Sequence, residues 1–551
     1  MAITLGTSAP STTAHRILNR LVSDRVASRV FARDASLWSD SAQVTNRLGW
    51  TDFEANARAA IADAEQIRDE LRSAGIDRVV LCGMGGSSLA PEVIARWSGT
   101  PLTVIDSTHP GFLAAELTSD LSRTLVVVSS KSGSTIETMS HRAAFAAAFT
   151  AAGIDPAERI LVITDPGSPL ERSARDAGQR VCFADPDVGG RFSALTAFGL
   201  VPTALAGVDV RELLDDACAA RELLMSDDPA NPALRLAAEI AAGLPSRFVL
   251  GIAEAPGTDW GLGSWIEQLV AESTGKYGHG VFPIALPRTA PELAAPPANL
   301  IRVRLGASEA AEVAQAGAEL TVAASLGAQF LLWEVATAVL GHLLGIDPFD
   351  QPDVESAKLA ARAVLEHPED SGSAGKATPI AELSAVLVAA PPKSLRGAAA
   401  DLPDTAAELL TALQAAVPPG GYLAVQAYLD PSGGSASALA ALRDALAQRL
   451  GVPVSLGWGP RYLHSVGQLH KGGPALGAFL QLIDTAAPDL AIPGSDSGFG
   501  TLIAAQARGD RKVLSGRGRA VFALGSPEPA ALIPELIDAV SAWEAVVPEP
   551  R

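Results

Sequence analysis

The segment TLVVVSSKSGSTIET, residues 124–138, joins an apolar run to a turn rich in hydroxyl side chains. Residues 124–128 are apolar and largely β-branched, which predicts a buried strand of a parallel sheet. The alanine-rich stretch from Glu137 to Ala152 predicts a helix capped by Ser134 or Thr135. A turn between a strand and a helix N-terminus favours anions. The segment therefore predicts either a phosphate-binding turn or an ordinary turn rich in capping residues.

The alternation of strand and helix continues on both sides of this segment. Apolar runs predict further strands at residues 78–82, 102–105, 160–163 and 180–183. A second series contains strands at 248–252 and 300–303 and a helix at 264–273, and a third contains strands at 422–428 and 520–524 and a helix at 436–450. This pattern predicts an α/β fold with parallel sheets flanked by helices, and the first two series read as two copies of one architecture.

The length of 551 residues exceeds what one ordinary core accommodates. We expect a helical lead-in at 1–75, α/β domains at 76–228 and 229–366, and a C-terminal α/β region at 376–551. A stretch containing Ser, Gly and Pro, at about 367–378, predicts a linker before that region.

Composition restricts the class of partner. Hydrophobic residues make up 48% of the chain and charged residues 19%, which is typical of a packed globular protein. The net charge of −19 argues against nucleic acid or an anionic membrane as the main partner. Cys82, Cys182 and Cys218 have no metal-type spacing and indicate a reducing compartment. The apolar segment 320–344 predicts a core helix rather than a membrane span, and no secretory signal is visible, so we expect a cytoplasmic protein.

The loop GMGGSS, residues 83–88, resembles part of a dinucleotide-binding fingerprint. It follows a predicted strand, and Asp106 ends the next strand at a spacing suitable for binding a ribose. Ser88, however, replaces the third glycine. The added hydroxyl donors suit a sugar or a phosphate better than a pyrophosphate, although a simple tight turn needs the same glycines.

Several charged or titratable residues lie near predicted loops. Arg191 follows a glycine pair and could bind an oxyanion, or could be a solvated surface arginine. Glu272 falls in the last turn of a predicted helix, a position that suits a general base but is also common for an exposed glutamate. Lys358 lies near a predicted helix start, where the helix dipole disfavours a cation, so its position indicates either chance or an anionic partner. His464 and His470 lie in a glycine-rich stretch, and either could transfer protons.

Together these stretches resemble the phosphoglucose isomerase family. The pieces are GMGGSSLAP, SSKSGSTIET, GGRFSALTAFG, QLVAESTGK, FDQPDVESAK and LHSVGQLHKGG, which span much of residues 75–360 and return at 455–475. The resemblance is close to the isomerase half of transaldolase–phosphoglucose isomerase fusions. It implies two sugar-isomerase (SIS) domains and the interconversion of glucose 6-phosphate and fructose 6-phosphate through a cis-enediol(ate), without metal or organic cofactor.

The resemblance also implies roles for individual residues. Glu272 is similar to the catalytic base, Arg191 to the arginine that stabilises the enediolate, and Lys358 and His464 to the ring-opening pair. The implied substrate-binding residues are Gly86, Ser87, Ser130, Lys131, Ser132, Thr135, Gln268 and Gln351.

The histidine departs from the family pattern. In the common form it lies between the glutamate and lysine motifs, whereas His464 follows both, which leaves His470 as the fallback. A homodimer is implied by the resemblance alone. The alternatives are an isomerase that also accepts mannose 6-phosphate, an amidotransferase-type isomerase and a non-catalytic sugar-phosphate sensor. The chain has no N-terminal cysteine nucleophile, which argues against an amidotransferase-type isomerase. Residues 1–75 and the acidic balance do not favour a DNA-binding helix pair, which argues against a sensor.

Overall fold

The first unit contains the five strands expected between residues 78 and 183. A computed structural model describes residues 3–8, 11–38, 42–307, 318–353, 377–395, 402–432 and 434–544. The strands are β2 (Arg78–Gly83), β3 (Thr103–Ile105), β4 (Thr124–Ser129), β5 (Ile160–Thr164) and β6 (Arg180–Phe183). They form a parallel sheet in the order β3-β2-β4-β5-β6. Helices α5 (Leu89–Ser98) and α7 (Ile136–Ala151) follow β2 and β4, as the alternating pattern predicts.

The second unit contains β7 (Val249–Glu254), β8 (Phe282–Ala285), β9 (Leu300–Gly306) and β10 (Leu320–Ala323), in the order β8-β7-β9-β10. These four strands are parallel, and β1 (Thr4–Thr7) completes the sheet antiparallel to β10. Helix α12 (Pro232–Gly243) precedes β7 and is capped by Asn231. The helical lead-in of the chain therefore also contains a strand, and its longest helix is α4 (Glu54–Ser73).

The apolar segment 320–344 is not one helix, and this expectation was wrong at its start. Residues 320–323 form β10, and helix α16 (Leu326–Leu344) begins after Ser325. Thr321 and Val322 are β-branched and suit a strand, but the uninterrupted apolarity of the segment hides the change of structure. Within the described residues α16 alone has the length and apolarity of a membrane span, and it is largely buried in the protein.

The third unit has the same strand order as the first two. It contains β13 (Tyr422–Tyr428), β14 (Val454–Trp458), β15 (Gly477–Asp484) and β16 (Ala520–Ser526), which are parallel in the order β14-β13-β15-β16. The edge strands β12 (Val386–Ala389) and β11 (Thr378–Pro379) continue it, with β12 antiparallel to β16. With the added strands β1, β11 and β12 set aside, the second strand of each unit in the chain lies at one edge and the first strand lies beside it, so the architecture occurs three times rather than twice.

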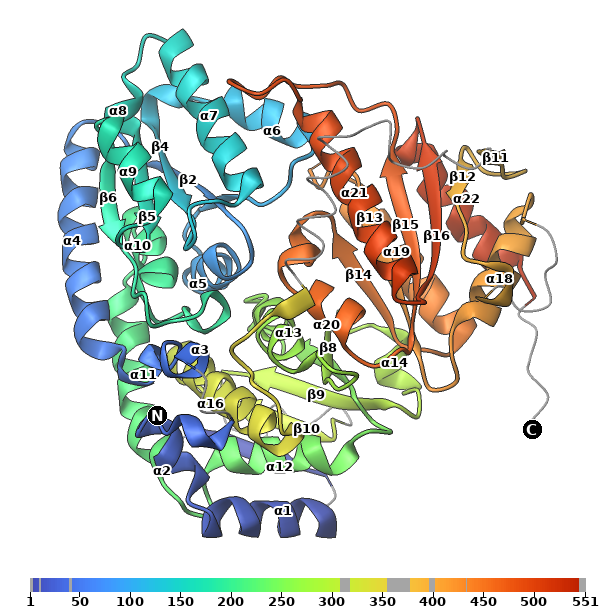
Figure 1. Cartoon of the computed structure of the whole chain (residues 1–551), viewed down its shortest axis with the longest axis horizontal. Helices are drawn as coiled ribbons and strands as arrows, with labels where there is room; N and C mark the ends of the chain where they lie inside the picture. Colours follow the sequence, from blue (N-terminus) through green and yellow to red (C-terminus); the bar gives the residue numbers. More distant parts are fainter. Residues whose placement is uncertain are drawn as a thin grey trace.

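The three units surround a central region that contains helix α13 (Leu262–Thr274) and the short helix α20 (Gly467–Gly472) (Figure 1). One hydrophobic core joins the first and second units, with Val127 of β4 and Val303 of β9 among its members. A second core joins the second and third units and includes Phe282 and Phe479. Helix α21 (Phe499–Gly516) packs Phe499 into the core on the other face of the first sheet. The loops between the three units are therefore fixed by packing on several sides.

Candidate active site

Glu272 lies in the last turn of α13, just before Gly275. Its side chain is buried. One carboxylate oxygen lies 3.2 Å from an Arg191 guanidinium nitrogen, and the other accepts a hydrogen bond of 3.2 Å from Gln268. Gln268 precedes Glu272 by one helical turn, so both side chains point to the same place. The end of α13 thus places a carboxylate and an amide next to the guanidinium of Arg191.

Arg191 is held in a fixed orientation by four further contacts. The guanidinium donates to the hydroxyl of Ser273 at 2.8 Å and to the side-chain oxygen of Gln351 at 3.0 Å. It also donates to the carbonyl oxygens of Pro348 at 2.6 Å and Asp350 at 2.8 Å. Arg191 is therefore a buried, engaged cation, and it brings Gln351 next to Glu272.

Lys276 is a site residue that the sequence interpretation missed. Its buried ammonium donates to the carbonyl oxygens of Asp347 and Asp350, both at 2.7 Å, and to the Asp350 carboxylate at 2.5 Å. Burial and the nearby Arg191 lower the pKa of Lys276 to about 8. Two cations, Arg191 and Lys276, thus hold the loop 347–351 by its backbone. The motif QLVAESTGK ends on this lysine, but nothing in the sequence indicates that the side chain is buried.

The glycine loop after β2 forms a short turn, η3 (Gly85–Ser87), against the loop that contains Arg191. A Cβ atom on Gly86 would lie 2.0 Å from the carbonyl oxygen of Gly190, so close packing of the two loops requires glycine here. Ser87 is buried, and among the described residues no partner binds its hydroxyl. The loop can therefore offer a hydroxyl to a ligand.

The hydroxyl-rich turn lies between β4 and the N-terminus of α7. Ser130 and Thr135 have hydroxyl oxygens 3.3 Å apart, and the hydroxyls of Ser132 and Ser134 are 3.0 Å apart. The ammonium of Lys131 forms an ion pair of 2.7 Å with Asp165 and also contacts the carbonyl oxygens of residues 185 and 186. The turn thus gathers hydroxyls at a helix N-terminus, while its lysine is neutralised by a carboxylate.

His464 reaches this region from the third unit. It ends the short turn η9 (Arg461–His464), which follows β14. Its backbone carbonyl accepts a hydrogen bond of 2.8 Å from Gln268, the residue that also binds Glu272. Its Nε2 lies 2.9 Å from Glu137 Oε1. Position in the sequence alone, after both other motifs, did not indicate this proximity.

Glu137 is a second residue whose role the sequence interpretation missed. It lies in the first turn of α7, is buried, and accepts hydrogen bonds from His464 and, at 2.7 Å, from Gln506 of α21. Burial opposes ionisation, but the charge of His464 and its hydrogen bond outweigh burial and lower the pKa of Glu137 to about 2. The carboxylate is thus ionised and fixes the imidazole ring.

His470 has a different environment from His464. It lies on α20, and its Nδ1 is 2.9 Å from the hydroxyl of Tyr422. Its ring packs edge-on against Phe282 and Phe479 in the core between the second and third units. Burial lowers its pKa well below the usual range. Lys358, the helix expected around it and nearly all of the expected linker lie outside the described residues.

Comparison with known proteins identifies the family. The sequence model of the phosphoglucose isomerase family matches residues 64–249. A glucose-6-phosphate isomerase of Thermus thermophilus is 31% identical over 387 residues, which cover 58% of this chain and 90% of that protein. The chain belongs to the phosphoglucose isomerase family. Enzymes of this family interconvert glucose 6-phosphate and fructose 6-phosphate, and the chain is an isomerase of this class.

A further relative agrees with this assignment, and two solved structures share the fold. The glucose-6-phosphate isomerase of Rubrobacter xylanophilus is 29% identical over 375 residues, which cover 55% of this chain and 86% of that protein. A solved structure of a hypothetical protein from Thermus thermophilus matches 66% of this chain and all of its own length, with 25% identity and a TM-score of 0.58. The glucose-6-phosphate isomerase of Chlamydia trachomatis, at 17% identity and a TM-score of 0.55 over 67% of this chain and 89% of its own, shares the fold.

Proposed function

We propose that this isomerase uses Glu272 as its general base, with His464 and Lys358 opening the sugar ring and Arg191 stabilising the enediolate. The observation that carries this proposal is the position of Gln268. Its amide binds the carboxylate of Glu272 and the backbone of His464 at once. The residue for proton transfer at carbon and the residue for ring opening therefore flank one side chain.

Ring opening needs a proton removed from the anomeric hydroxyl and another delivered to the ring oxygen. With Nε2–H of His464 donated to Glu137, the other ring nitrogen is left for the substrate. No described residue binds that nitrogen. By resemblance, Lys358 is the second group in this step. His470, held in an aromatic core, is a poor candidate, so we assign ring opening to His464.

Isomerisation then moves a proton from C2 to C1 on one face of the open chain. Glu272 would take this proton and return it. Negative charge develops on the substrate oxygens in the enediolate, and the guanidinium of Arg191 lies beside the base. Because its remaining contacts fix Arg191, little reorganisation is needed as this charge appears.

The phosphate would bind at the turn before α7, to Ser130, Ser132 and Thr135. Hydroxyl donors and the helix N-terminus both favour an anion there. We propose that Lys131, through its ion pair with Asp165 and its contacts with the carbonyl oxygens of residues 185 and 186, supports the turn that binds the phosphate. Gly86, Ser87, Gln268 and Gln351 would contact the sugar.

Other parts of the proposal rest on the resemblance and on composition. We propose a cytoplasmic homodimer that uses no metal or organic cofactor and has neither nucleic acid nor a membrane as a partner. A coupled dehydrogenase assay with glucose 6-phosphate, fructose 6-phosphate and mannose 6-phosphate tests the substrate range. Turnover of glucose 6-phosphate and fructose 6-phosphate alone supports a phosphoglucose isomerase. Turnover of all three sugar phosphates supports an isomerase that also accepts mannose 6-phosphate, and turnover of none overturns the proposal.

A further inference from the structure

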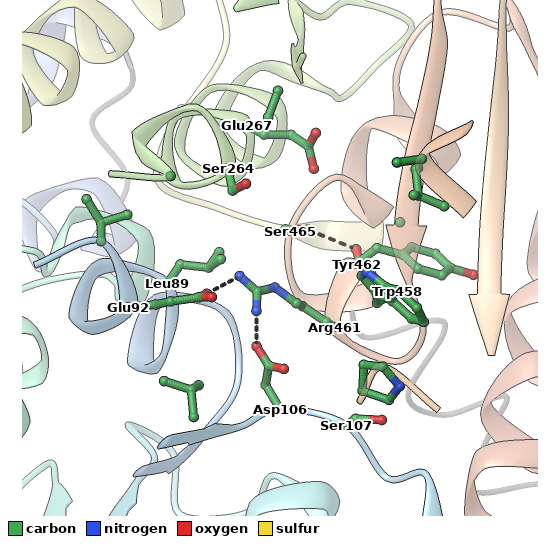
Figure 2. A pocket seen from close by; sticks show the side chains of 18 of the residues that line it. Leu89, Glu92, Asp106, Ser107, Ser264, Glu267, Trp458, Arg461, Tyr462 and Ser465 are labelled. Carbon is green, nitrogen blue, oxygen red and sulfur yellow. Dashed lines mark hydrogen bonds and ion pairs between the residues drawn. The ribbon is translucent and has the colours of Figure 1, made fainter. Parts of the chain in front are cut away.

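The turn that ends in His464 begins with a second charged residue, Arg461. The guanidinium of Arg461 donates to Glu92 of α5 at 2.5 Å and lies 2.8 Å from the carboxylate of Asp106, just after β3 (Figure 2). Glu92 and Asp106 both belong to the first unit, whereas Arg461 belongs to the third. Arg461 therefore joins two units three residues before His464.

A cavity of about 490 Å³ borders this ion-pair cluster. All three units line it: α5 and the loop after β3 from the first, α13 and β8 from the second, and α19 (Ser435–Leu450), β14 and η9 from the third. Figure 2 shows Glu267 and Ser264 on α13 across the cavity from the guanidinium. On the side that faces the cavity, the Arg461 end of the turn is therefore not held by dense packing. The two ion pairs with Glu92 and Asp106 are the main polar attachment of this end to the first unit.

The opposite end of η9 is attached through His464 itself, by its ring to Glu137 and by its carbonyl oxygen to Gln268. A four-residue turn thus has one polar anchor to the other units at each end, while the buried Tyr462 between them donates to Asp510 of its own unit at 2.6 Å. Loss of the Arg461 anchor would leave Glu92 and Asp106 facing each other without their shared cation, and the two carboxylates would repel each other. The turn would then be held to the first unit mainly by the histidine that must move protons.

We propose that Arg461 is a positioning residue that fixes His464 for ring opening. It acts through the backbone of η9 and does not touch the substrate. This inference rests on the ring-opening role proposed for His464. It predicts that Arg461 affects ring opening selectively and leaves the chemistry at Glu272 intact.

Exchange between the two ring anomers of glucose 6-phosphate separates these steps, because it needs ring opening but not removal of the C2 proton. We expect Arg461→Gln to slow enzyme-catalysed anomer exchange, measured by NMR, by about ten- to a hundredfold. The affinity for an open-chain sugar-phosphate hydroxamate, a mimic of the enediolate, should stay within about threefold in calorimetry because no ring is opened.

The double variant Arg461→Gln/His464→Asn tests whether the two residues act in one step. If Arg461 acts through His464, the double variant is no slower in anomer exchange than His464→Asn alone. Additive losses, or normal exchange in Arg461→Gln, would overturn the inference. Normal exchange in His464→Asn would instead overturn the proposed role of His464, so the two failures are distinguishable.

Arg96→Gln is the matched control. Arg96 donates to Glu92 at 2.6 Å in the same cluster, but it lies on α5 and not on η9. The Arg96 side chain is 55% exposed, so its replacement should leave anomer exchange within about twofold. If Arg461→Gln does not fold, Asp106→Asn removes the charge of one of its two partners. That variant should lose several-fold in exchange, whereas Arg461→Lys should retain more activity than Arg461→Gln, and the opposite results would contradict the inference.

Discussion

Glu137, at the start of α7 in the first unit, accepts a hydrogen bond from His464 of the third unit, with 2.9 Å between Oε1 and Nε2. The carboxylate fixes which ring nitrogen carries the proton. Glu137→Gln would weaken this control, because an amide can donate to the ring as well as accept. By analogy with other carboxylate–histidine pairs, we expect turnover of glucose 6-phosphate to fall by about 10²- to 10⁴-fold. Steady-state kinetics in the coupled assay measures this.

A matched control is Glu158→Gln, which changes an exposed glutamate in the same unit and should retain normal turnover. Full activity in Glu137→Gln would contradict the orienting role.

The pH dependence of unfolding gives a second test of the interaction between Glu137 and His464. The pKa of Glu137 is about 2 in the folded protein, below the ordinary glutamate value of about 4.3. The ionised carboxylate therefore stabilises the fold at pH values above about 4.3, the ordinary pKa. This contribution to the free energy of unfolding is lost as the pH falls towards 2.

Replacement of Glu272, the proposed general base, has a different expected signature. Glu272→Gln keeps the shape of the side chain but cannot accept the C2 proton. We expect kcat to fall by about 10³-fold or more while substrate affinity, measured by calorimetry, changes little. Anomer exchange should persist in this variant, since ring opening does not require the base. A variant that still isomerises at a comparable rate would remove Glu272 from this role.

The sequence predicted much of the fold because strand and helix differ in hydrophobic pattern. The strand predicted at 422–428 matches β13 residue for residue, and the strand predicted at 124–128 is one residue shorter than β4. The failure at 320–323 has a physical cause, because both the strand and the following helix are buried on all sides and neither shows a periodic pattern. The third copy of the strand order depends on pairings between distant segments, which a local pattern does not encode.

The candidate site was only partly predictable for a similar reason. Glu272 and Gln268 are one helical turn apart, so their proximity follows from the helix itself. The choice between His464 and His470 depends on partners far away in the chain, Glu137 for the first and Tyr422 for the second. The role of Lys276 as a buried clamp on the loop 347–351 likewise depends on a loop more than seventy residues away. Residue type and spacing alone do not predict such contacts between distant segments.

The Lys276 clamp predicts a coupled loss of stability and activity. Lys276→Met removes the cation and leaves the Asp350 carboxylate and the Asp347 carbonyl oxygen without this donor, while Arg191 still donates to the Asp350 carbonyl oxygen. We expect a loss of about 3–5 kcal/mol in the free energy of unfolding, as for other broken buried ion pairs. Because the same loop contains Gln351, KM for fructose 6-phosphate should also rise. Denaturant unfolding and kinetics test both, and Lys393→Met, which changes a lysine in the short turn after β12, serves as the control. Unchanged stability would contradict the clamp.

Glu334, in the middle of α16, predicts a pH-dependent stability unrelated to catalysis. Its side chain is 1% exposed, and one carboxyl oxygen has no hydrogen-bond partner among the described residues. Burial raises its pKa well above the ordinary value. The folded protein therefore keeps this group protonated at pH values where the unfolded chain has released the proton. Its favourable contribution is complete below the ordinary pKa of about 4.3 and is lost progressively as pH rises towards the folded value.

Glu334→Gln replaces the acid by an amide of similar shape that cannot ionise. We expect the variant to unfold at a higher temperature than the wild type at pH 8, while the difference becomes small or reverses near pH 5, where less of the unfolded carboxyl is ionised. Thermal unfolding across this pH range, with Glu158→Gln as the exposed control, measures the change. Equal pH slopes in Glu334→Gln and the wild type would show that Glu334 is not held protonated. Activity should be unaffected at temperatures where both proteins are folded, because α16 supplies no proposed catalytic residue.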